Sequence, residues 1–337
     1  MLEKPDLEDE KIIVCMQAEY GIRIVQIAFL PLGGDLSTAV YRAVADDKTP
    51  YFCKLKFAFF DEISIELPAF LSEQGIAQII PARLTNSGRL WAERDEFRLI
   101  LYPFVEGTSG FEIELTEPQW ADFSAALKRI HTTAVPPALS QKLGKESYSA
   151  EWRDICRNVI QRLDNETFDD PVTIGLAAFL HPRRETILDL IERAEQFAQT
   201  LASRATELVI CHSDIHPGNL FIDTQGTLFI VDWDYPLLAP KERDLMFIGG
   251  GQGYVGRTAQ EEETLFYRYY GDSAIDPVAL AYYRFDRNLY DLSVECTRIF
   301  SSTGSDQDRA RSLEIITWLF LPGGSIEMAY KAADKTR

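Results

Sequence analysis

The hydrophobic period of the sequence changes near residue 116, and this change limits the folds that the chain can adopt. Before it, segments 22–32, 39–44 and 51–57 are rich in β-branched, aromatic or alternating residues, which is typical of strands. From Thr116, a candidate helix N-cap, apolar residues recur at helical intervals. The sequence therefore predicts an α+β chain with a small β-rich N-terminal lobe and a larger, mainly helical C-terminal lobe.

The β-rich part is expected to form a three-strand meander, with Gly33 and Gly34 as the turn between the first two strands. A helical pattern follows over 61–75, but Pro68 lies inside it, so we expect that helix to begin near residue 65. A buried strand over 97–107 then leads to the helical part. The other helices are expected at 7–19, 116–135, 150–164, 183–204, 259–271, 276–300 and 307–320.

One hairpin interrupts the helical part. The stretch "NLFIDTQGTLFIVDWD" (219–234) has two apolar strands around a Thr-Gln-Gly turn. Because the strands of a hairpin run antiparallel, Asn219 at its start and Asp232 at its end are expected side by side at one open end.

Composition bounds the class of protein. With 52 acidic against 34 basic side chains the formal charge is -18, which excludes a typical nucleic-acid binder. The same charge would attract a cationic substrate or simply maintain solubility. Five scattered cysteines without CxxC spacing suit reduced thiols, and we see no signal peptide or membrane-spanning run. We therefore expect a soluble cytoplasmic protein, either a monomer or a homodimer.

The stretch "CHSDIHPGN" (211–219) has three interpretations. His212 and His216 can be zinc ligands, although the proline and glycine that follow would end the helix such a pair needs. The polar residues can simply satisfy the backbone of a tight loop. The third interpretation is phosphoryl transfer, because His212, Asp214 and Asn219 match the H-x-D-x-x-x-x-N catalytic loop of protein kinases.

Phosphoryl transfer explains why these residue types stand at these positions. An aspartate, here Asp214, must orient the attacking hydroxyl, while an amide oxygen and a carboxylate, here Asn219 and Asp232, hold Mg²⁺ against the phosphates. The meander adds a lysine, Lys54, in its third strand, with Lys56 on the same face as its solvated neighbour. Gly33 and Gly34 can bring backbone N–H groups close to phosphate. A P-loop motif is absent from the sequence.

Taken in chain order, these residues resemble the aminoglycoside phosphotransferase and choline kinase family, which shares the two-lobed protein kinase-like fold. Within that family the sequence looks most similar to the spectinomycin 9-phosphotransferases. The resemblance spans nearly the whole chain and is carried by "CHSDIHPGNLFI", "IVDWD", "YFCKLKF", "LTEPQWADFSAALKRIH", "VDWDYPLLAPKERDLMFIGGG" and "AYYRFDRNLYDL".

The resemblance implies a role for each matching residue. Asp214 would accept or orient the proton of the substrate hydroxyl, His212 would brace the loop, and Asn219 with Asp232 would bind Mg²⁺. Lys54 would contact the ATP phosphates with help from a glutamate of the next helix, and both Glu62 and Glu66 are available. The adenine would lie against the crossover at Leu101, Tyr102 and Phe104. Asp244 would hold the catalytic loop through backbone hydrogen bonds, or cap the helix that follows it.

Substrate contacts are expected on the helix that contains "YYRFDRNLYDLSVEC". Acidic residues there can bind the ammonium groups of an aminocyclitol, or form a solvated face. Aromatic residues can stack on a sugar ring, or belong to the core. The candidates on this helix are Asp286, Tyr290, Asp291, Glu295, Tyr282 and Tyr283, and Trp233 after the hairpin is a further aromatic candidate.

The resemblance also implies lobes and a reaction. We expect a nucleotide-binding lobe over 1–101, a crossover over 102–108 and a helical lobe with the catalytic loop over 109–337. The expected reaction moves the γ-phosphoryl of Mg-ATP to a hydroxyl of a spectinomycin-type antibiotic, which would confer resistance. The alternatives are a housekeeping kinase for choline, homoserine, a fructosamine or methylthioribose, a nucleotide-binding regulator without catalysis, and a metal-binding protein.

Overall fold

The structure is a computed structural model that describes residues 4–32, 37–57, 60–94, 96–271, 273–301 and 305–336. It consists of two compact units. Unit 1 comprises Met1–Leu143 and Gly218–Pro236, and unit 2 comprises Gly144–Pro217 and Leu237–Arg337. A β-rich N-terminal region and a helical C-terminal region confirm the predicted α+β class. The units group residues differently from the lobes expected at 1–101 and 109–337, which stay a prediction.

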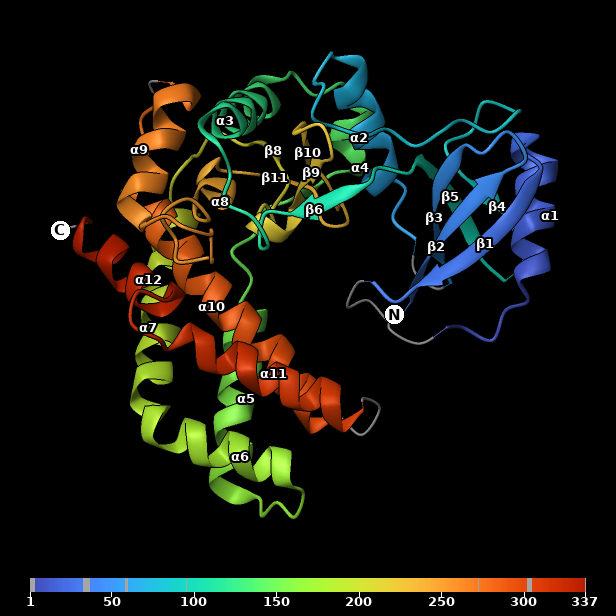
Figure 1. Cartoon of the computed structure of the whole chain (residues 1–337). Helices are drawn as coiled ribbons and strands as arrows, with labels where there is room; N and C mark the ends of the chain where they lie inside the picture. Colours follow the sequence, from blue (N-terminus) through green and yellow to red (C-terminus); the bar gives the residue numbers. More distant parts are fainter. Residues whose placement is uncertain are drawn as a thin grey trace. The chain divides into compact units, whose positions relative to one another are not determined.

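Unit 1 is built around a five-stranded antiparallel sheet with the order β1-β2-β3-β5-β4 (Figure 1). Its strands are β1 (Ile24–Leu30), β2 (Thr38–Ala45), β3 (Pro50–Lys56), β4 (Ala92–Glu93) and β5 (Arg98–Pro103). The helix α1 (Asp9–Tyr20) packs its apolar face on this sheet, and the alternating residues of β2, β3 and β5 complete the core. The meander β1-β2-β3 was therefore predicted correctly.

The helix α2 (Ile63–Glu73) begins earlier than expected. Asp61 supports this start, because its Oδ1 accepts the N–H of Ile63 at 3.2 Å and its carbonyl accepts the Ser64 hydroxyl at 2.7 Å. Pro68 consequently lies inside the helix, where it removes one backbone hydrogen bond without ending it.

A second sheet of unit 1 holds the predicted hairpin, β9 (Leu220–Asp223) and β10 (Leu228–Ile230), with β6 (Gly107–Ser109) added along β9. Gly107 permits this close approach, since a Cβ there would lie 2.1 Å from the carbonyl oxygen of Ile222. The helix α3 (Glu117–Thr132) starts with a capping box. Its Gln119 side chain donates a hydrogen bond from Nε2 to the carbonyl of Gly226 in the hairpin turn. The short α4 (Pro137–Lys142) ends this part of the chain.

Unit 2 is a helical bundle in which the 24-residue α10 (Pro277–Phe300) lies at the centre (Figure 1). Because neighbours surround it, α10 is buried on most of its circumference. Around it pack α5 (Glu151–Asn165), α6 (Pro171–Leu180), α7 (Arg184–Ala202), α11 (Asp306–Leu319) and α12 (Ser325–Asp334). The predicted helices of this half are present, whereas α6 and α12 were not predicted.

The remaining elements of unit 2 are a small sheet and three further helical segments. The sheet consists of β7 (Gly144–Lys145), β11 (Leu237–Ala239) and β8 (Val209–Cys211), and the helical segments are the short α8 (Glu242–Leu245), α9 (Ala259–Tyr270) and the 3-10 turn His181–Arg183. A second 3-10 turn, Pro217–Asn219, leads from the loop that contains Asp214 into the hairpin of unit 1. Within the described residues, no helix has the length and apolarity needed to cross a membrane.

Candidate active site

The hairpin of unit 1 brings Asn219 and Asp232 to the same open end. Leu220 pairs with Ile230, and the N–H of Val231 donates to the carbonyl of Asn219 at 2.9 Å. Asp232 follows directly, so the predicted juxtaposition is confirmed at the level of the backbone. Asn219 is buried, whereas the Asp232 side chain is 53% exposed. Two oxygen-bearing side chains therefore flank one end of the hairpin.

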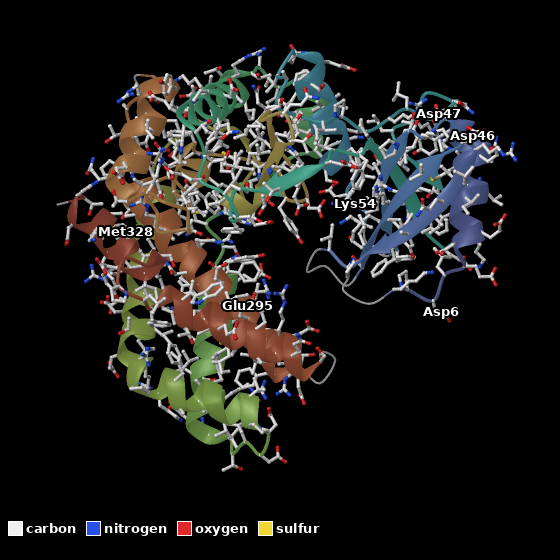
Figure 2. All side chains as sticks on the ribbon, viewed as in Figure 1. Asp6, Asp46, Asp47, Lys54, Glu295 and Met328 are labelled. Carbon is white, nitrogen blue, oxygen red and sulfur yellow. The ribbon has the colours of Figure 1, made fainter. Side chains whose placement is uncertain are left out.

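Lys54 and Lys56 project from β3 on the same face, and both bind one carboxylate, that of Asp234 (Figure 2 labels Lys54). The Lys54 ammonium lies 2.7 Å from Asp234 Oδ1 and 3.6 Å from Asp232 Oδ1, and the Lys56 ammonium lies 3.0 Å from Asp234 Oδ2. The expectation of a solvated Lys56 was wrong, because this side chain is only 10% exposed.

The glutamates expected beside Lys54 have a different partner. Lys142 of α4 binds Glu66 at 2.7 Å and Glu62 at 3.1 Å. The expected pair of Lys54 with either glutamate is therefore not formed, because Asp234 occupies Lys54 and α4 supplies a competing ammonium.

The crossover residues are mostly engaged by their own unit. Leu101 is fully buried and its carbonyl accepts the N–H of Arg83 at 2.7 Å, while the N–H of Phe104 donates to Pro50 at 3.3 Å. Tyr102 is half-buried and packs edge-on against Phe52. Their role in holding adenine stays a prediction.

The remaining candidates of unit 1 are Gly33, Gly34 and Trp233. Gly33 and Gly34, the expected phosphate cover, lie outside the described residues. Trp233 is only 6% exposed and its indole N–H donates to Ile230 at 3.1 Å. The expected stacking of Trp233 on a sugar ring therefore lacks an open ring face in this structure.

In unit 2, Asp244 holds the loop that follows β8. Its Oδ2 accepts the N–H of His212 at 2.9 Å and its Oδ1 accepts the N–H of Ser213 at 2.7 Å, all of them buried. The predicted bracing by Asp244 is confirmed. It matters because Ser213 has a φ of 74°, a left-handed conformation that a non-glycine residue keeps only when its surroundings enforce it.

The two histidines of the loop are engaged near Asp214. His212 is fully buried and its Nδ1 accepts the N–H of Asp214 at 3.3 Å, as expected for a brace. His216 Nε2 lies 3.7 Å from Asp214 Oδ2, and burial lowers the pKa of His216 to about 4. These contacts within the loop do not favour a zinc ion shared by the two imidazoles.

Asp214 itself is bound by an arginine that the sequence had not singled out. Arg287 of α10 donates from Nη1 to Asp214 Oδ1 at 2.5 Å. Burial alone would raise the pKa of Asp214, but the charge of Arg287, with a smaller effect of His216, holds it below its usual value. Asp214 is thus a carboxylate at neutral pH. Arg287 also binds Asp291 four residues further along α10, and this helical spacing is a sequence signal for Arg287 but not for its contact with Asp214.

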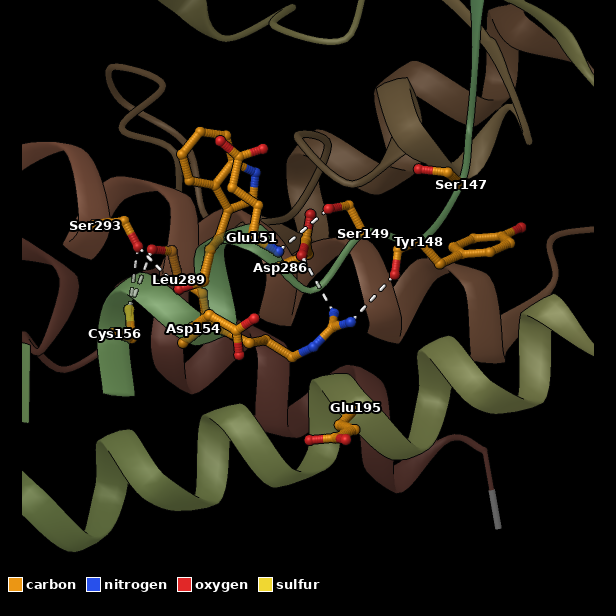
Figure 3. Close-up of polar contacts among 12 residues, drawn as sticks. Ser147, Tyr148, Ser149, Glu151, Asp154, Cys156, Glu195, Asp286, Leu289 and Ser293 are labelled. Carbon is orange, nitrogen blue, oxygen red and sulfur yellow. Dashed lines mark hydrogen bonds and ion pairs between the residues drawn. The ribbon is translucent and has the colours of Figure 1, made fainter. Parts of the chain in front are cut away.

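The acidic substrate candidates of α10 are also paired. Asp286 is buried and lies 3.9 Å from both Arg153 and Arg243; Figure 3 shows it beside the start of α5, near Tyr148. Burial raises the pKa of Asp286 to about 6. Asp286 therefore belongs to an internal ionic cluster, and its expected contact with a substrate ammonium stays a prediction.

The other α10 candidates differ in exposure. Tyr290 is half-buried between Trp152 and Arg287 and stays a prediction. Tyr282 and Tyr283 are fully buried core residues. Glu295, labelled in Figure 2, binds Arg298 through Oε1 at 2.8 Å, while its buried Oε2 has no hydrogen-bond partner among the described residues.

Comparison with known proteins identifies the family. The model of the phosphotransferase enzyme family matches residues 28–270, which is more than half of the chain. The chain belongs to the phosphotransferase enzyme family. This phosphotransferase is accordingly an ATP-dependent enzyme that phosphorylates a hydroxyl of a small molecule, and its family generally requires Mg²⁺.

Solved structures similar to the phosphotransferase support this assignment. It is 33% identical to the spectinomycin phosphotransferase APH(9)-Ia in complex with ADP and spectinomycin, with a TM-score of 0.91 and coverage of 98% of this chain and 99% of that one. The AMP-bound complex of APH(9)-Ia matches at 33% identity and a TM-score of 0.85, covering 95% and 98%. An amicoumacin kinase with AMP-PNP and Ca²⁺, 15% identical with a TM-score of 0.62 and coverage of 98% and 94%, shares the fold. A comparison with curated protein sequences gives no match.

The side chains of the phosphotransferase suit Mg-ATP chemically. Asn219 and Asp232 offer the amide and carboxylate oxygens that Mg²⁺ prefers, and Asp234 adds a second carboxylate. Lys54 carries the positive charge that phosphate groups need. Burial would lower the pKa of Lys54, but Asp234 and Asp232 raise it, so the ammonium stays charged.

Proposed function

We propose that the phosphotransferase moves the γ-phosphoryl group of Mg-ATP to a hydroxyl of an aminocyclitol antibiotic, with spectinomycin as the substrate. The observation that carries this proposal is the similarity along the whole chain, at 33% identity, to a spectinomycin phosphotransferase solved with its antibiotic. Antibiotic resistance is the biological consequence that this substrate implies. A cytoplasmic location completes the proposal, since ATP is available there and the five buried cysteines are free thiols.

In this proposal Asp214 is the catalytic residue. Its carboxylate, charged at neutral pH, orients the acceptor hydroxyl and takes its proton. The bond between the γ-phosphorus and the oxygen that bridges to the β-phosphate breaks, a bond to the acceptor oxygen forms, and ADP leaves.

Asn219 and Asp232 would hold Mg²⁺, which when bound neutralises phosphate charge during transfer. Lys54 would bind the α- and β-phosphates, exchanging its contact with Asp234 for them. Asp244 and His212 would keep the loop in place through the backbone hydrogen bonds described above.

A second candidate is a metabolic kinase for another small alcohol, such as choline, homoserine, a fructosamine or methylthioribose. One observation favours it. Asp286 and Asp291, both expected to bind substrate ammonium groups, are already paired with arginines. An acceptor with fewer ammonium groups than an aminocyclitol would need fewer such carboxylates.

A substrate panel separates these candidates. ADP release with Mg-ATP would be measured for spectinomycin, kanamycin, choline, homoserine and methylthioribose, with Asp214→Ala beside the unaltered protein. The proposal predicts turnover with spectinomycin that the substitution abolishes. Turnover with a metabolite alone would replace spectinomycin by that metabolite, and turnover that survives Asp214→Ala would refute the role of Asp214.

A further inference from the structure

Arg287 and Asp214 form a direct ion pair inside unit 2, although 73 residues separate them in sequence. The N···O distance is 2.5 Å, so the two charged groups are in direct hydrogen-bond contact. The side chain of Arg287 is 15% exposed and that of Asp214 is 32% exposed. The pair is therefore largely shielded from water, and it fixes the direction of the Asp214 carboxylate.

Arg287 is itself held in one position. Its Nε binds Asp291 at 3.0 Å, one helical turn further along α10. Its guanidinium carbon lies 5.2 Å from the ring centre of Phe247 and 5.1 Å from that of Tyr290. A planar guanidinium can serve two carboxylates and two rings at once, which an ammonium cannot do. Since α10 is the central helix of the unit, Arg287 connects Asp214 to a rigid element.

We propose that Arg287 is a positioning residue for phosphoryl transfer, which ties Asp214 to α10 in the orientation that receives the acceptor hydroxyl. This inference rests on the proposed role of Asp214 and adds a residue from a part of the chain where only substrate contacts were expected. An error of about 1 Å in such an orientation costs on the order of 10²-fold in rate.

The pair also sets the charge state of Asp214. The titratable and charged groups that act on Asp214 come from α10 and from its own loop: Arg287, Tyr290, Asp291, His212 and His216. Burial raises the pKa of Asp214 and Arg287 is the strongest influence that lowers it. Without the guanidinium, burial would prevail and the pKa of Asp214 would rise. The acid limb of kcat/KM would then move to higher pH, because Asp214 must be deprotonated to accept a proton.

The test compares Arg287→Gln and Arg287→Lys with a control, Arg162→Gln. Arg162 lies on α5 and forms an exposed pair with Glu166 four residues away. kcat, KM for ATP and the pH profile of kcat/KM would be measured with spectinomycin, or with whichever panel acceptor supports ADP release. We expect Arg287→Gln to lower kcat roughly 10²-fold with little change in KM for ATP, and to move the acid limb to higher pH. Arg287→Lys keeps the positive charge and should restore part of kcat and reverse part of the shift of the acid limb. The control should match the unaltered protein.

Two results would overturn the proposal. One is an Arg287→Gln variant with unaltered kcat and pH profile. The other is a loss of kcat without any movement of the acid limb and without recovery in Arg287→Lys, which would mean that Arg287 merely stabilises α10. If the glutamine variant does not fold, the lysine variant decides by the same two measurements. Turnover by Asp214→Asn would instead refute the role of Asp214, so the two failures are distinguishable.

Discussion

The ammonium of Lys54 donates to Asp234, two residues beyond the candidate metal ligand Asp232, at a distance of 2.7 Å. Lys56 binds the other oxygen of the same carboxylate. Two largely buried cations thus share one anion. Both lysines would lose this contact if Asp234 turned to a metal ion or if phosphate groups took its place. This arrangement makes the two lysines a matched pair for mutation.

Lys54→Met and Lys56→Met should affect ATP use unequally. Lys54 lies next to both Asp234 and Asp232, and Lys56 lies next to Asp234. We expect Lys54→Met to lower kcat/KM for ATP on the order of 10²-fold and Lys56→Met less than about tenfold. Steady-state kinetics at varied ATP measure this. Equal losses, or a larger loss at Lys56, would contradict the assignment of Lys54 as the phosphate ligand.

Asp244→Asn should destabilise the protein and impair catalysis together. The carboxylate accepts hydrogen bonds from two buried backbone N–H groups. The amide of asparagine has only one oxygen, so its NH₂ group would face one of these N–H groups, which would then lack an acceptor. Such a loss costs about 2–4 kcal/mol in the free energy of unfolding. Urea denaturation and kcat would both be measured.

Asp223→Asn is the matched control for Asp244→Asn. Asp223 also accepts two backbone N–H groups, those of Gln225 and Thr227, but in an exposed turn. We expect a much smaller loss of stability and unaltered kcat. If both substitutions behave alike, burial of the Asp244 contacts is not what holds the loop.

His216→Asn should remove a pH dependence of stability between about pH 4 and 6.5. Burial lowers the pKa of His216 to about 4 in the folded protein, whereas the unfolded chain takes up the proton near pH 6.5. The unfolded state therefore binds more protons in this window, and the stability that neutral His216 provides is lost as the pH falls. The free energy of unfolding of the unaltered protein should drop by roughly 2–4 kcal/mol more than that of the variant.

Comparing the two proteins at each pH is essential for that measurement. Burial raises the pKa of Asp286 to about 6 and that of Glu262 to about 7, so these groups lose stabilisation as the pH rises. Their effect on the free energy of unfolding is opposite to that of His216. It is the same in both proteins and therefore cancels when the variant is subtracted from the unaltered protein. If the two proteins differ in free energy of unfolding by the same amount at pH 7 and at pH 4, His216 takes up its proton in the folded protein as readily as in the unfolded chain. That result would contradict the prediction.

Asp232→Asn should separate activity from stability. Asp232 has a φ of 64° and a side chain that is 53% exposed, and asparagine tolerates the left-handed conformation at least as well as aspartate. We expect the free energy of unfolding to stay within about 0.5 kcal/mol, while the Mg²⁺ concentration needed for half-maximal ADP release rises strongly. A stability loss without any change in the Mg²⁺ requirement would argue against a metal ligand at this position.

Local features of the site could be predicted from the sequence. The hairpin fixes Asn219 and Asp232 next to each other because antiparallel pairing depends only on a short turn. The alternation of β3 likewise places Lys54 and Lys56 on one face. These relationships need no information from distant parts of the chain.

Long-range partners could not be predicted in the same way. Lys142 and Glu66 are 76 residues apart and Arg287 and Asp214 are 73 apart, and many other charged residues were equally plausible partners. The burial of Asp286 near Arg153 and Arg243 could not be predicted either, because it depends on the helices that surround α10. The helix α6 was missed because "PVTIGLAAFL" combines proline, glycine and β-branched residues, which are weak helix formers.

The product of the reaction tests the central claim most directly. Spectinomycin would be incubated with Mg-ATP and either the unaltered protein or Asp214→Asn, and the mixture examined by mass spectrometry and ³¹P NMR. We predict one phosphate ester per spectinomycin molecule, formed in step with ADP and missing with Asp214→Asn. Unmodified spectinomycin, in a preparation that phosphorylates another alcohol of the panel, would contradict the proposed substrate.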